Sequence, residues 1–203
     1  YSAGHSRRVA ALAERIAFSL PLAPTEVVTI RRAALLHDIG LVAVPSFVLH
    51  KPEGRLTDAE WESLRLHPYH AERILARVPA FVPVIPLVAA HHERPDGQGY
   101  FRGLSQQQIP LGARVIAVAD TFDELTHARP GRAALDQETA LGEMSRDAGT
   151  RFDREAFAAL AGTLNVPVPG ATSPAPFRRS GESVSPKQEW PAGLTAREVQ
   201  VLR

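Results

Sequence analysis

The chain has 203 residues, 44% of them hydrophobic and 22% charged, a balance that fits one globular domain with a substantial core plus an appendage. A formal net charge of +1 gives no electrostatic reason to expect wholesale binding to nucleic acid or to a membrane surface. The absence of cysteine excludes disulfides, thiolate nucleophiles and Cys-ligated metal sites, and it suits the cytoplasmic location that we expect.

No apolar stretch is long enough to cross a bilayer, so we expect no membrane segment in this chain. The sequence begins at Tyr1 and stops inside a predicted helix at Arg203. We therefore expect a fragment of a longer protein.

Helical periodicity runs through most of the chain, and sustained period-two alternation is absent, which predicts an all-α bundle. An i, i+3, i+4, i+7 stripe is formed by Val9, Leu12, Ala13 and Ile16. Thr57 and Glu60 form a capping-box pattern, Asp136 and Asp153 stand where N-caps belong, and Gly40 stands where a helix-ending glycine belongs. Helices are predicted near residues 5–20, 25–38, 57–66, 68–78, 83–92, 111–126, 136–148 and 153–164.

The composition changes after Asn165. Residues 166–192 are rich in proline and serine and lack a periodic apolar pattern, which predicts a flexible linker. Residues 193–203 contain a second capping-box pattern, at Thr195 and Glu198, that predicts the start of another helix. The predicted organisation is therefore a domain over 1–165, a linker over 166–192 and the beginning of a further module over 193–203.

Imidazole and carboxylate side chains gather at predicted helix ends. His91 and His92 close an apolar run, and His37 and Asp38 close another. Imidazole nitrogens and carboxylate oxygens are ligands of hydrolytic divalent metals. Asp120 lies in the most apolar helix, where an unpaired carboxylate would be costly and a nearby cation would remove the cost.

Each of these residues has an ordinary alternative when it is considered alone. Asp120 could reach solvent or cap a neighbouring helix, His37 and Asp38 could form a structural hydrogen bond, and His5 and His67 could be helix-end residues. Taken together, they predict two metals that share a bridging carboxylate, an arrangement that phosphoester hydrolases use. The predicted ligands are His5, His37, Asp38, His67, His91, His92 and Asp120; His50, His70 and His127 are interpreted as surface or supporting residues.

The order of these motifs resembles an HD-GYP domain, an all-helical branch of the HD metal-dependent phosphohydrolases. The resemblance covers residues 1–165 and includes the runs 35–40, 96–100 and 109–120. It implies an HD-type helical bundle that hydrolyses cyclic di-GMP at a centre of two or three metals. Iron or manganese are the usual occupants, with magnesium, nickel or zinc as alternatives.

The resemblance also implies residue roles. His5, His37, Asp38 and Asp120 would hold one metal, and Asp38, His67, His91 and His92 would hold the other; among them His37, Asp38 and Asp120 are the expected catalytic residues. Tyr1 stands where trinuclear members carry a glutamate, which favours two metals. Tyr100, Arg129 and Arg132 match residues that bind the dinucleotide, although the two arginines could instead be a solvated pair.

Three positions depart from the family pattern: Leu41 replaces a lysine, Phe101 replaces a proline and Gly131 replaces a tyrosine. The lysine contacts the phosphate in the family and supplies a proton to the leaving oxygen, so Leu41 predicts slow turnover. The alternative is a nucleotide-sensing module with weak catalysis, or an HD hydrolase that acts on another phosphoester. A homodimer is a further expectation.

The C-terminal segment resembles the opening of a LuxR-type helix-turn-helix. Leu194, Thr195, Arg197 and Glu198 match the start of its first helix. The resemblance implies DNA binding through a recognition helix beyond Arg203 and coupling of the bundle to transcription. An amphipathic terminal helix is the alternative for a segment this short.

Overall fold

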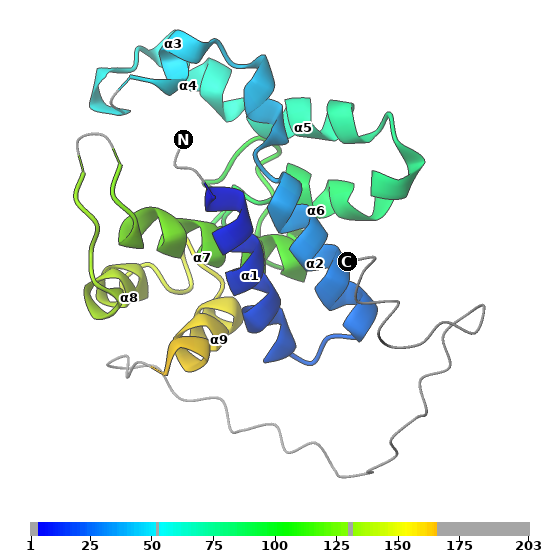
Figure 1. Ribbon diagram of the computed structural model, residues 1–203, viewed down its shortest axis with the longest axis vertical. Helices are drawn as coiled ribbons and strands as arrows, with labels where there is room; N and C mark the ends of the chain where they lie inside the picture. Colours follow the sequence, from blue (N-terminus) through cyan, green and yellow to red (C-terminus); the bar gives the residue numbers. More distant parts are fainter. Residues whose placement is uncertain (1–3, 52, 130–131, 166–203) are drawn as a thin grey trace, which may run out of the picture.

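The computed structural model describes residues 4–51, 53–129 and 132–165, and within these ranges the chain is helical and forms no strand (Figure 1). The all-α prediction is confirmed. The α-helices are α1 (His5–Phe18), α2 (Pro24–Leu36), α3 (Ser46–Leu49), α4 (Asp58–Arg65), α5 (His67–Leu75), α6 (Ile85–Ala89), α7 (Leu111–Thr126), α8 (Gln137–Ser145) and α9 (Arg154–Leu164). Short 3-10 helices are η1 (Ile39–Ala43), η2 (Glu53–Arg55), η3 (Pro79–Val84) and η4 (Gln106–Gln108).

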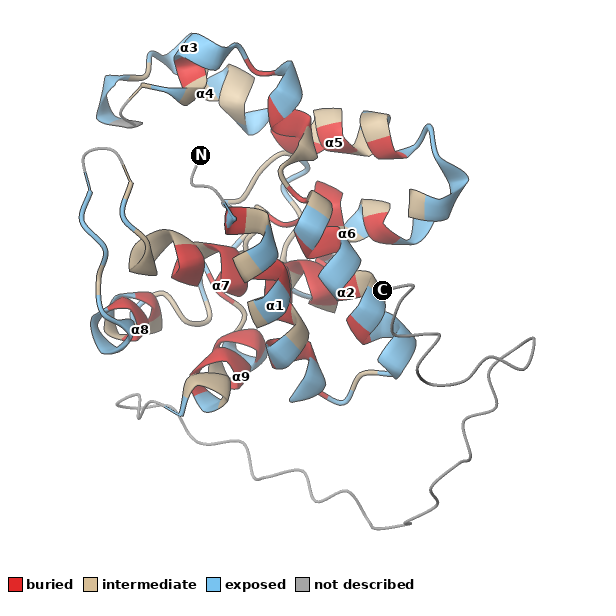
Figure 2. Cartoon of the chain, in the orientation of Figure 1, coloured by how far each residue is buried: buried red, intermediate tan, exposed pale blue. Residues whose placement is uncertain are grey.

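The main core lies where α1, α2 and α7 pack on one another, and α9 closes it on one side (Figures 1 and 2). Val9, Ile16 and Ile116 are fully buried there. The predicted stripe of α1 faces this core because residues three and four apart share one side of a helix. Burying large aliphatic side chains contributes about 1.5–3 kcal/mol each, so this core is the frame that holds the rest of the domain.

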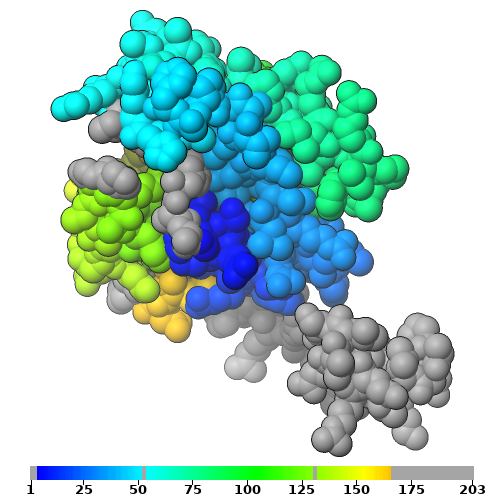
Figure 3. Space-filling model, turned by 45° about the horizontal axis from the view of Figure 1, so that its top comes forward, coloured from blue at the N-terminus to red at the C-terminus, as the bar shows by residue number. Residues whose placement is uncertain are grey.

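A smaller apolar cluster holds the segment around α3 and α4, which forms the upper edge of the molecule in Figure 3. Leu41, Val44 and Val48 are its buried members, and Leu64 of α4 packs against them. Leu41, the residue that replaces the family's lysine, is only 8% exposed. Its side chain therefore has a packing role in this chain.

The predicted helix ends are partly correct. The limits of α7 agree with the prediction, and the expected N-caps are confirmed: Thr57 accepts a hydrogen bond from the Glu60 amide, Asp136 from the Thr139 amide and Asp153 from two amides of α9. The short α3 and the 3-10 helices were not predicted. The helix predicted over 83–92 is wrong at both ends, because residues 79–84 form η3 and α6 ends at Ala89.

Gly40 does not end a helix, contrary to the prediction. It lies inside η1, where a Cβ atom would stand 1.9 Å from the carbonyl oxygen of His67. Its missing side chain is what allows η1 to contact α5. Glycine is needed at this position for close approach of two backbones rather than for an unusual φ angle.

Among the described residues, no helix is long and apolar enough to cross a membrane. The predicted linker over 166–192 and the predicted helix-turn-helix start over 193–203 lie outside the described residues.

Candidate metal centre

The predicted ligands come from five segments that meet beside the main core. His5 is the first residue of α1, His37 and Asp38 follow α2, and His67 begins α5. The other ligands are His91 and His92, which follow α6, and Asp120, which lies within α7. All of the predicted ligands are buried except Asp38 and His92, which are half-buried. The structure thus brings together every residue of the predicted ligand set.

The Nδ1 atoms of three of these histidines are held by the backbone one turn earlier. His37 Nδ1 lies 2.7 Å from the Ala34 carbonyl oxygen, His67 Nδ1 lies 2.8 Å from that of Leu64, and His91 Nδ1 lies 2.6 Å from that of Val88. A carbonyl oxygen can only accept, so Nδ1 must donate in each case. The Nε2 lone pair is then left for a metal, as in most protein-bound imidazole ligands.

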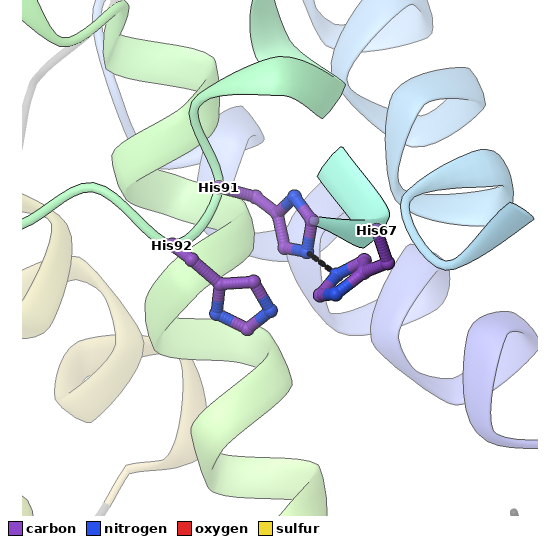
Figure 4. A group of neighbouring side chains, drawn as sticks. All are labelled: His67, His91 and His92. Atoms are coloured by element: carbon purple, nitrogen blue, oxygen red, sulfur yellow. Dashed lines mark hydrogen bonds between the residues drawn. The ribbon is translucent and has the colours of Figure 1, made fainter. Parts of the chain in front are cut away.

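Imidazole nitrogens and carboxylate oxygens form two groups whose ligand atoms lie within 4.8 Å of one another: His67, His91 and His92 in one, and His5, His37 and Asp38 in the other. Figure 4 shows the first group, in which the Nε2 atoms of His67 and His91 are 3.3 Å apart. Asp38 lies between the groups. Its Oδ2 is 3.2 Å from His37 Nε2, and its Oδ1 is 3.8 Å from His67 Nε2.

Asp120 completes the second group from α7. Its Oδ1 lies 3.1 Å from His5 Nε2 and 3.6 Å from His37 Nε2. His37 Nε2, Asp38 Oδ2 and Asp120 Oδ1 are buried and have no hydrogen-bond partner within the described chain. Buried polar atoms without partners are costly, and atoms of this type converging on one point fit a divalent cation.

The electrostatics differ between the two groups. Burial lowers the pKa of His67 and His91 below the ordinary range and lowers that of His92 to about 3, so this group is neutral near pH 7. Neutral imidazole is the form that binds a metal.

In the other group, burial also opposes protonation of His5 and His37, but the nearby carboxylates outweigh it. Asp38 and Asp120 raise the pKa of His37 well above its usual value, and Asp120 with Asp123 raises that of His5 to about 9. Burial acts in the opposite sense on Asp120, but His37 and His5 hold its pKa well below the usual range. A cation entering this group must displace protons.

Tyr100 lies beside the histidine group. Its ring stacks on that of His92, with centroids 4.7 Å apart and planes 25° apart. Burial, with the negative charges of Asp120 and Glu124, raises the pKa of the Tyr100 hydroxyl. The guanidinium of Arg65 in α4 lies 5.9 Å from the Tyr100 ring centroid, within cation–π range.

Arg129 and Arg132 follow α7 and face each other through two backbone hydrogen bonds. Arg129 forms a 2.7 Å ion pair with Glu124, and Arg132 donates to the Glu124 carbonyl oxygen. Burial and the charge of Asp120 raise the pKa of the Glu124 carboxyl to about 7, against the effect of Arg129. The two predicted substrate-binding arginines thus lie at the C-terminal end of the helix that carries Asp120.

Comparisons with known proteins decide the family. A family model described as an HD domain matches residues 2–156. The chain belongs to the HD-domain family.

Among curated relatives of this HD domain, a 3′3′-cGAMP-specific phosphodiesterase 3 of Vibrio cholerae is 43% identical over 166 residues, which are 82% of this chain and 36% of the relative. The cyclic di-GMP phosphodiesterase response regulator RpfG of Xanthomonas campestris is 41% identical over 75% of this chain and 41% of its own length. The chain therefore spans well under half of these curated relatives.

Solved structures agree with the fold. The HDG"Y"P protein Bd1817 of Bdellovibrio bacteriovorus superposes with a TM-score of 0.66 at 20% identity, over 79% of this chain and 51% of that one. A cyclic GMP-AMP-specific phosphodiesterase of Vibrio cholerae superposes with a TM-score of 0.51 at 39% identity, over 83% of this chain and 37% of that one.

Sequence reasoning missed two residues that shape the site of this HD domain, Glu93 and Asp123. The buried Glu93 carboxylate accepts hydrogen bonds from the backbone amides of Arg102, Gly103 and Leu104, which folds the loop that carries Tyr100. Asp123, one turn after Asp120, is also buried and contacts His5. The signals were present, since Glu93 follows the histidine pair directly and Asp123 shares a helix face with Asp120.

Proposed function

We propose that this HD domain is a phosphodiesterase that hydrolyses a cyclic dinucleotide, with cyclic di-GMP as the substrate, at a centre of two divalent metal ions. The observation that carries the proposal is the pair of ligand groups joined by Asp38, with unpartnered buried atoms on His37, Asp38 and Asp120. The curated relatives named above act on cyclic dinucleotides by name, which supports the substrate class.

The metal ligands would divide as follows: His5, His37, Asp38 and Asp120 at one ion, and Asp38, His67, His91 and His92 at the other. Bound cations of this kind supply Lewis-acid polarisation and lower the pKa of water. Asp38 has one oxygen near each group, so its carboxylate would contribute a ligand atom to both. Iron or manganese are the proposed occupants, with magnesium, nickel or zinc as alternatives that elemental analysis distinguishes.

The residues around the ligands would bind the substrate. Tyr100, whose ring stacks on His92 and lies 5.9 Å from the Arg65 guanidinium, would line the pocket that receives a base of the dinucleotide. Arg129 and Arg132 supply positive charge for the phosphates. In the reaction, water oxygen bonds to phosphorus, the bond from phosphorus to the ribose 3′ oxygen breaks, and that oxygen takes up a proton.

This chain differs from the family pattern at the residue that supplies a proton to the leaving oxygen. Leu41 offers no proton, so we propose slow turnover. If Leu41→Lys restores the missing acid, the rate per bound metal should rise by about 10²–10⁴-fold. An unchanged rate in a variant that keeps its metal and binds dinucleotide would contradict this explanation.

A turnover assay tests the proposed function. The chain is purified without oxygen, its metals are counted by elemental analysis, and cyclic di-GMP and 3′3′-cGAMP are followed by chromatography. We expect two metals per chain and linear dinucleotide over multiple turnovers, with no product from Asp38→Asn. Metal-loaded protein that leaves both substrates intact would overturn the proposal.

The alternative function is a sensing module. Leu41 favours it, because binding would survive while cleavage is lost. Tight dinucleotide binding without product, measured in the same preparation, identifies this alternative. Hydrolysis of a different phosphoester, with neither cyclic dinucleotide cleaved, identifies an HD hydrolase of other specificity.

The remaining organisation is also a proposal: a catalytic domain over 1–165, a linker over 166–192 and a LuxR-type DNA-binding module beginning at 193–203. Gel-shift measurements on the full protein, with and without cyclic dinucleotide, test the DNA partner. Sedimentation velocity tests the expected homodimer.

A further inference from the structure

Asp123 is a buried carboxylate that is not in the ligand set. It lies on α7, one turn beyond Asp120, and its side chain is 4% exposed. Its Oδ2 is 2.8 Å from His5 Nδ1 and 2.9 Å from an Arg8 nitrogen, and its Oδ1 is 2.7 Å from Arg8 Nε. The imidazole of His127 also faces it, with Nδ1 3.2 Å from Oδ1.

His5 differs from its partners in how its Nδ1 is held. His37, His67 and His91 each donate to a backbone carbonyl three residues earlier, whereas the Nδ1 of His5 meets a side chain 118 residues away. His5 opens α1 and follows Gly4, whose φ of 84° turns the chain off the helical path. The orientation of the His5 imidazole therefore depends on a contact with α7 rather than on its own helix.

We propose that Asp123 is a positioning residue, held by Arg8, that keeps a proton on His5 Nδ1 and directs His5 Nε2 toward Asp120 and Asp38. The proposal rests on the metal centre proposed above. Nε2 is 3.1 Å from Asp120 Oδ1 and 3.6 Å from Asp38 Oδ2, so the orientation set by Asp123 points the lone pair at the carboxylates of the same metal group.

The geometry has a clear physical effect. A carboxylate that accepts from Nδ1–H fixes the tautomer and makes Nε2 a better ligand. The two-nitrogen contact with Arg8 holds the carboxylate in place and offsets its charge, as bidentate guanidinium–carboxylate pairs do. Removing such a partner typically weakens metal affinity by about 10–100-fold.

A double-mutant cycle separates positioning from a general structural role. Mn²⁺ affinity of the metal-free full chain is measured by chelator competition for wild type, Asp123→Ala, His5→Ala and the double variant. We expect Asp123→Ala to weaken affinity by about 10–100-fold in the wild-type background and to have almost no effect in the His5→Ala background. Equal losses in both backgrounds, or no loss in the first, would overturn the proposal.

Asp123→Asn and Asp153→Asn provide the matched comparisons. The asparagine at 123 retains an oxygen acceptor for Nδ1–H, so it should lose less affinity than alanine. Asp153 also pairs with an arginine, Arg114 at 3.2 Å, but it is the N-cap of α9 and contacts none of the ligands in the described chain, so its variant should bind Mn²⁺ like wild type.

A second readout does not depend on metal. In the metal-free protein, the His5 Nδ1 proton should give a downfield, slowly exchanging signal in imidazole ¹H–¹⁵N spectra, and Asp123→Ala should abolish it. A signal that survives overturns the positioning role even if Mn²⁺ does not bind. Loss of the signal in a chain that binds no Mn²⁺ would instead leave Asp123 in its role and refute the metal centre.

Discussion

Replacing Gly40 with alanine should separate the two halves of the metal centre. Gly40 lies in η1, directly after His37 and Asp38, and η1 packs against the start of α5. An alanine Cβ would stand 1.9 Å from the His67 carbonyl oxygen and 2.6 Å from the Ala71 amide nitrogen. Both obstacles are backbone atoms, so rotation of a side chain cannot relieve them.

The size of the displacement follows from these distances. Cβ atoms essentially never approach other heavy atoms more closely than 3.0 Å, so η1 and α5 must move apart by about 1.1 Å. His67 would move with α5, away from Asp38. Metal–ligand distances tolerate only about 0.2 Å, so the ion bound by His67 should be lost or bound at least tenfold more weakly. The strain itself should cost about 1–3 kcal/mol of unfolding free energy.

The assay compares Gly40→Ala with Gly142→Ala by urea unfolding and by Mn²⁺ titration. Gly142 lies in α8 with nothing within 4 Å of its Cβ position, so alanine there should raise the unfolding free energy by about 0.5–1 kcal/mol and leave metal binding unchanged. Wild-type Mn²⁺ affinity in Gly40→Ala would refute the argument that this contact sets the spacing of the centre.

Three further predictions concern charge and packing around the centre. Metal-free protein should be most stable near pH 6.5. Asp120 and Asp123 outweigh burial and raise the pKa of His5 to about 9, so the stability that protonated His5 contributes is lost as pH rises from 6.5 toward 9. Burial lowers the pKa of His92 to about 3, so the unfolded chain takes up a proton that the folded chain does not, and stability falls as pH drops below 6.5. Urea midpoints that climb steadily from pH 6.5 to 9 would contradict this assignment. Leu41→Lys should lower the unfolding free energy by about 1–3 kcal/mol because Leu41 is 8% exposed, whereas Val42→Lys, at a site that is 77% exposed, should cost almost nothing in the same urea titration. Arg65→Ala should weaken cyclic dinucleotide binding about tenfold in calorimetry, but Arg73→Ala should not, since its guanidinium lies over Tyr69 rather than Tyr100; equal effects would remove Arg65 from the site.

Periodicity was sufficient to predict the helices that form the main core. The stripe on α1 and the limits of α7 depend on local apolar spacing, which a sequence displays directly. Helix ends near the site were harder to predict. Adjacent residues on a helix point about 100° apart, so His91 and His92 can share one centre only because α6 ends at Ala89. Apolar periodicity does not reveal that requirement.

Contacts between distant segments could not be read from the chain alone. Gly40 looked like a helix terminator, and its actual role depends on how closely η1 approaches α5. Asp123 shares a helix face with Asp120, but its contact with His5 could not be predicted because His5 is 118 residues earlier in the chain. The convergence of the ligand residues was predicted from their shared position at helix ends and on an apolar helix, and the order of motifs that resembles a family added the division of these ligands between two metals.

The metal-ligand histidines and the arginines predicted to bind substrate are held in different ways, and this difference bears on which substitutions the chain can accept. His37, His67 and His91 are oriented by backbone carbonyls of their own local segments, which no side-chain substitution removes. The predicted substrate side depends on side-chain pairs instead, as in the Arg129–Glu124 ion pair.

A phosphate that engages Arg129 must compete with the Glu124 carboxylate, 2.7 Å away, for the same guanidinium. The strength of that competition depends on Glu124, whose pKa burial and Asp120 raise to about 7, so a modest change in local charge alters it. The charge state of Glu124 therefore governs how readily Arg129 can pair with a phosphate, while the backbone contacts that orient His37, His67 and His91 stay unchanged.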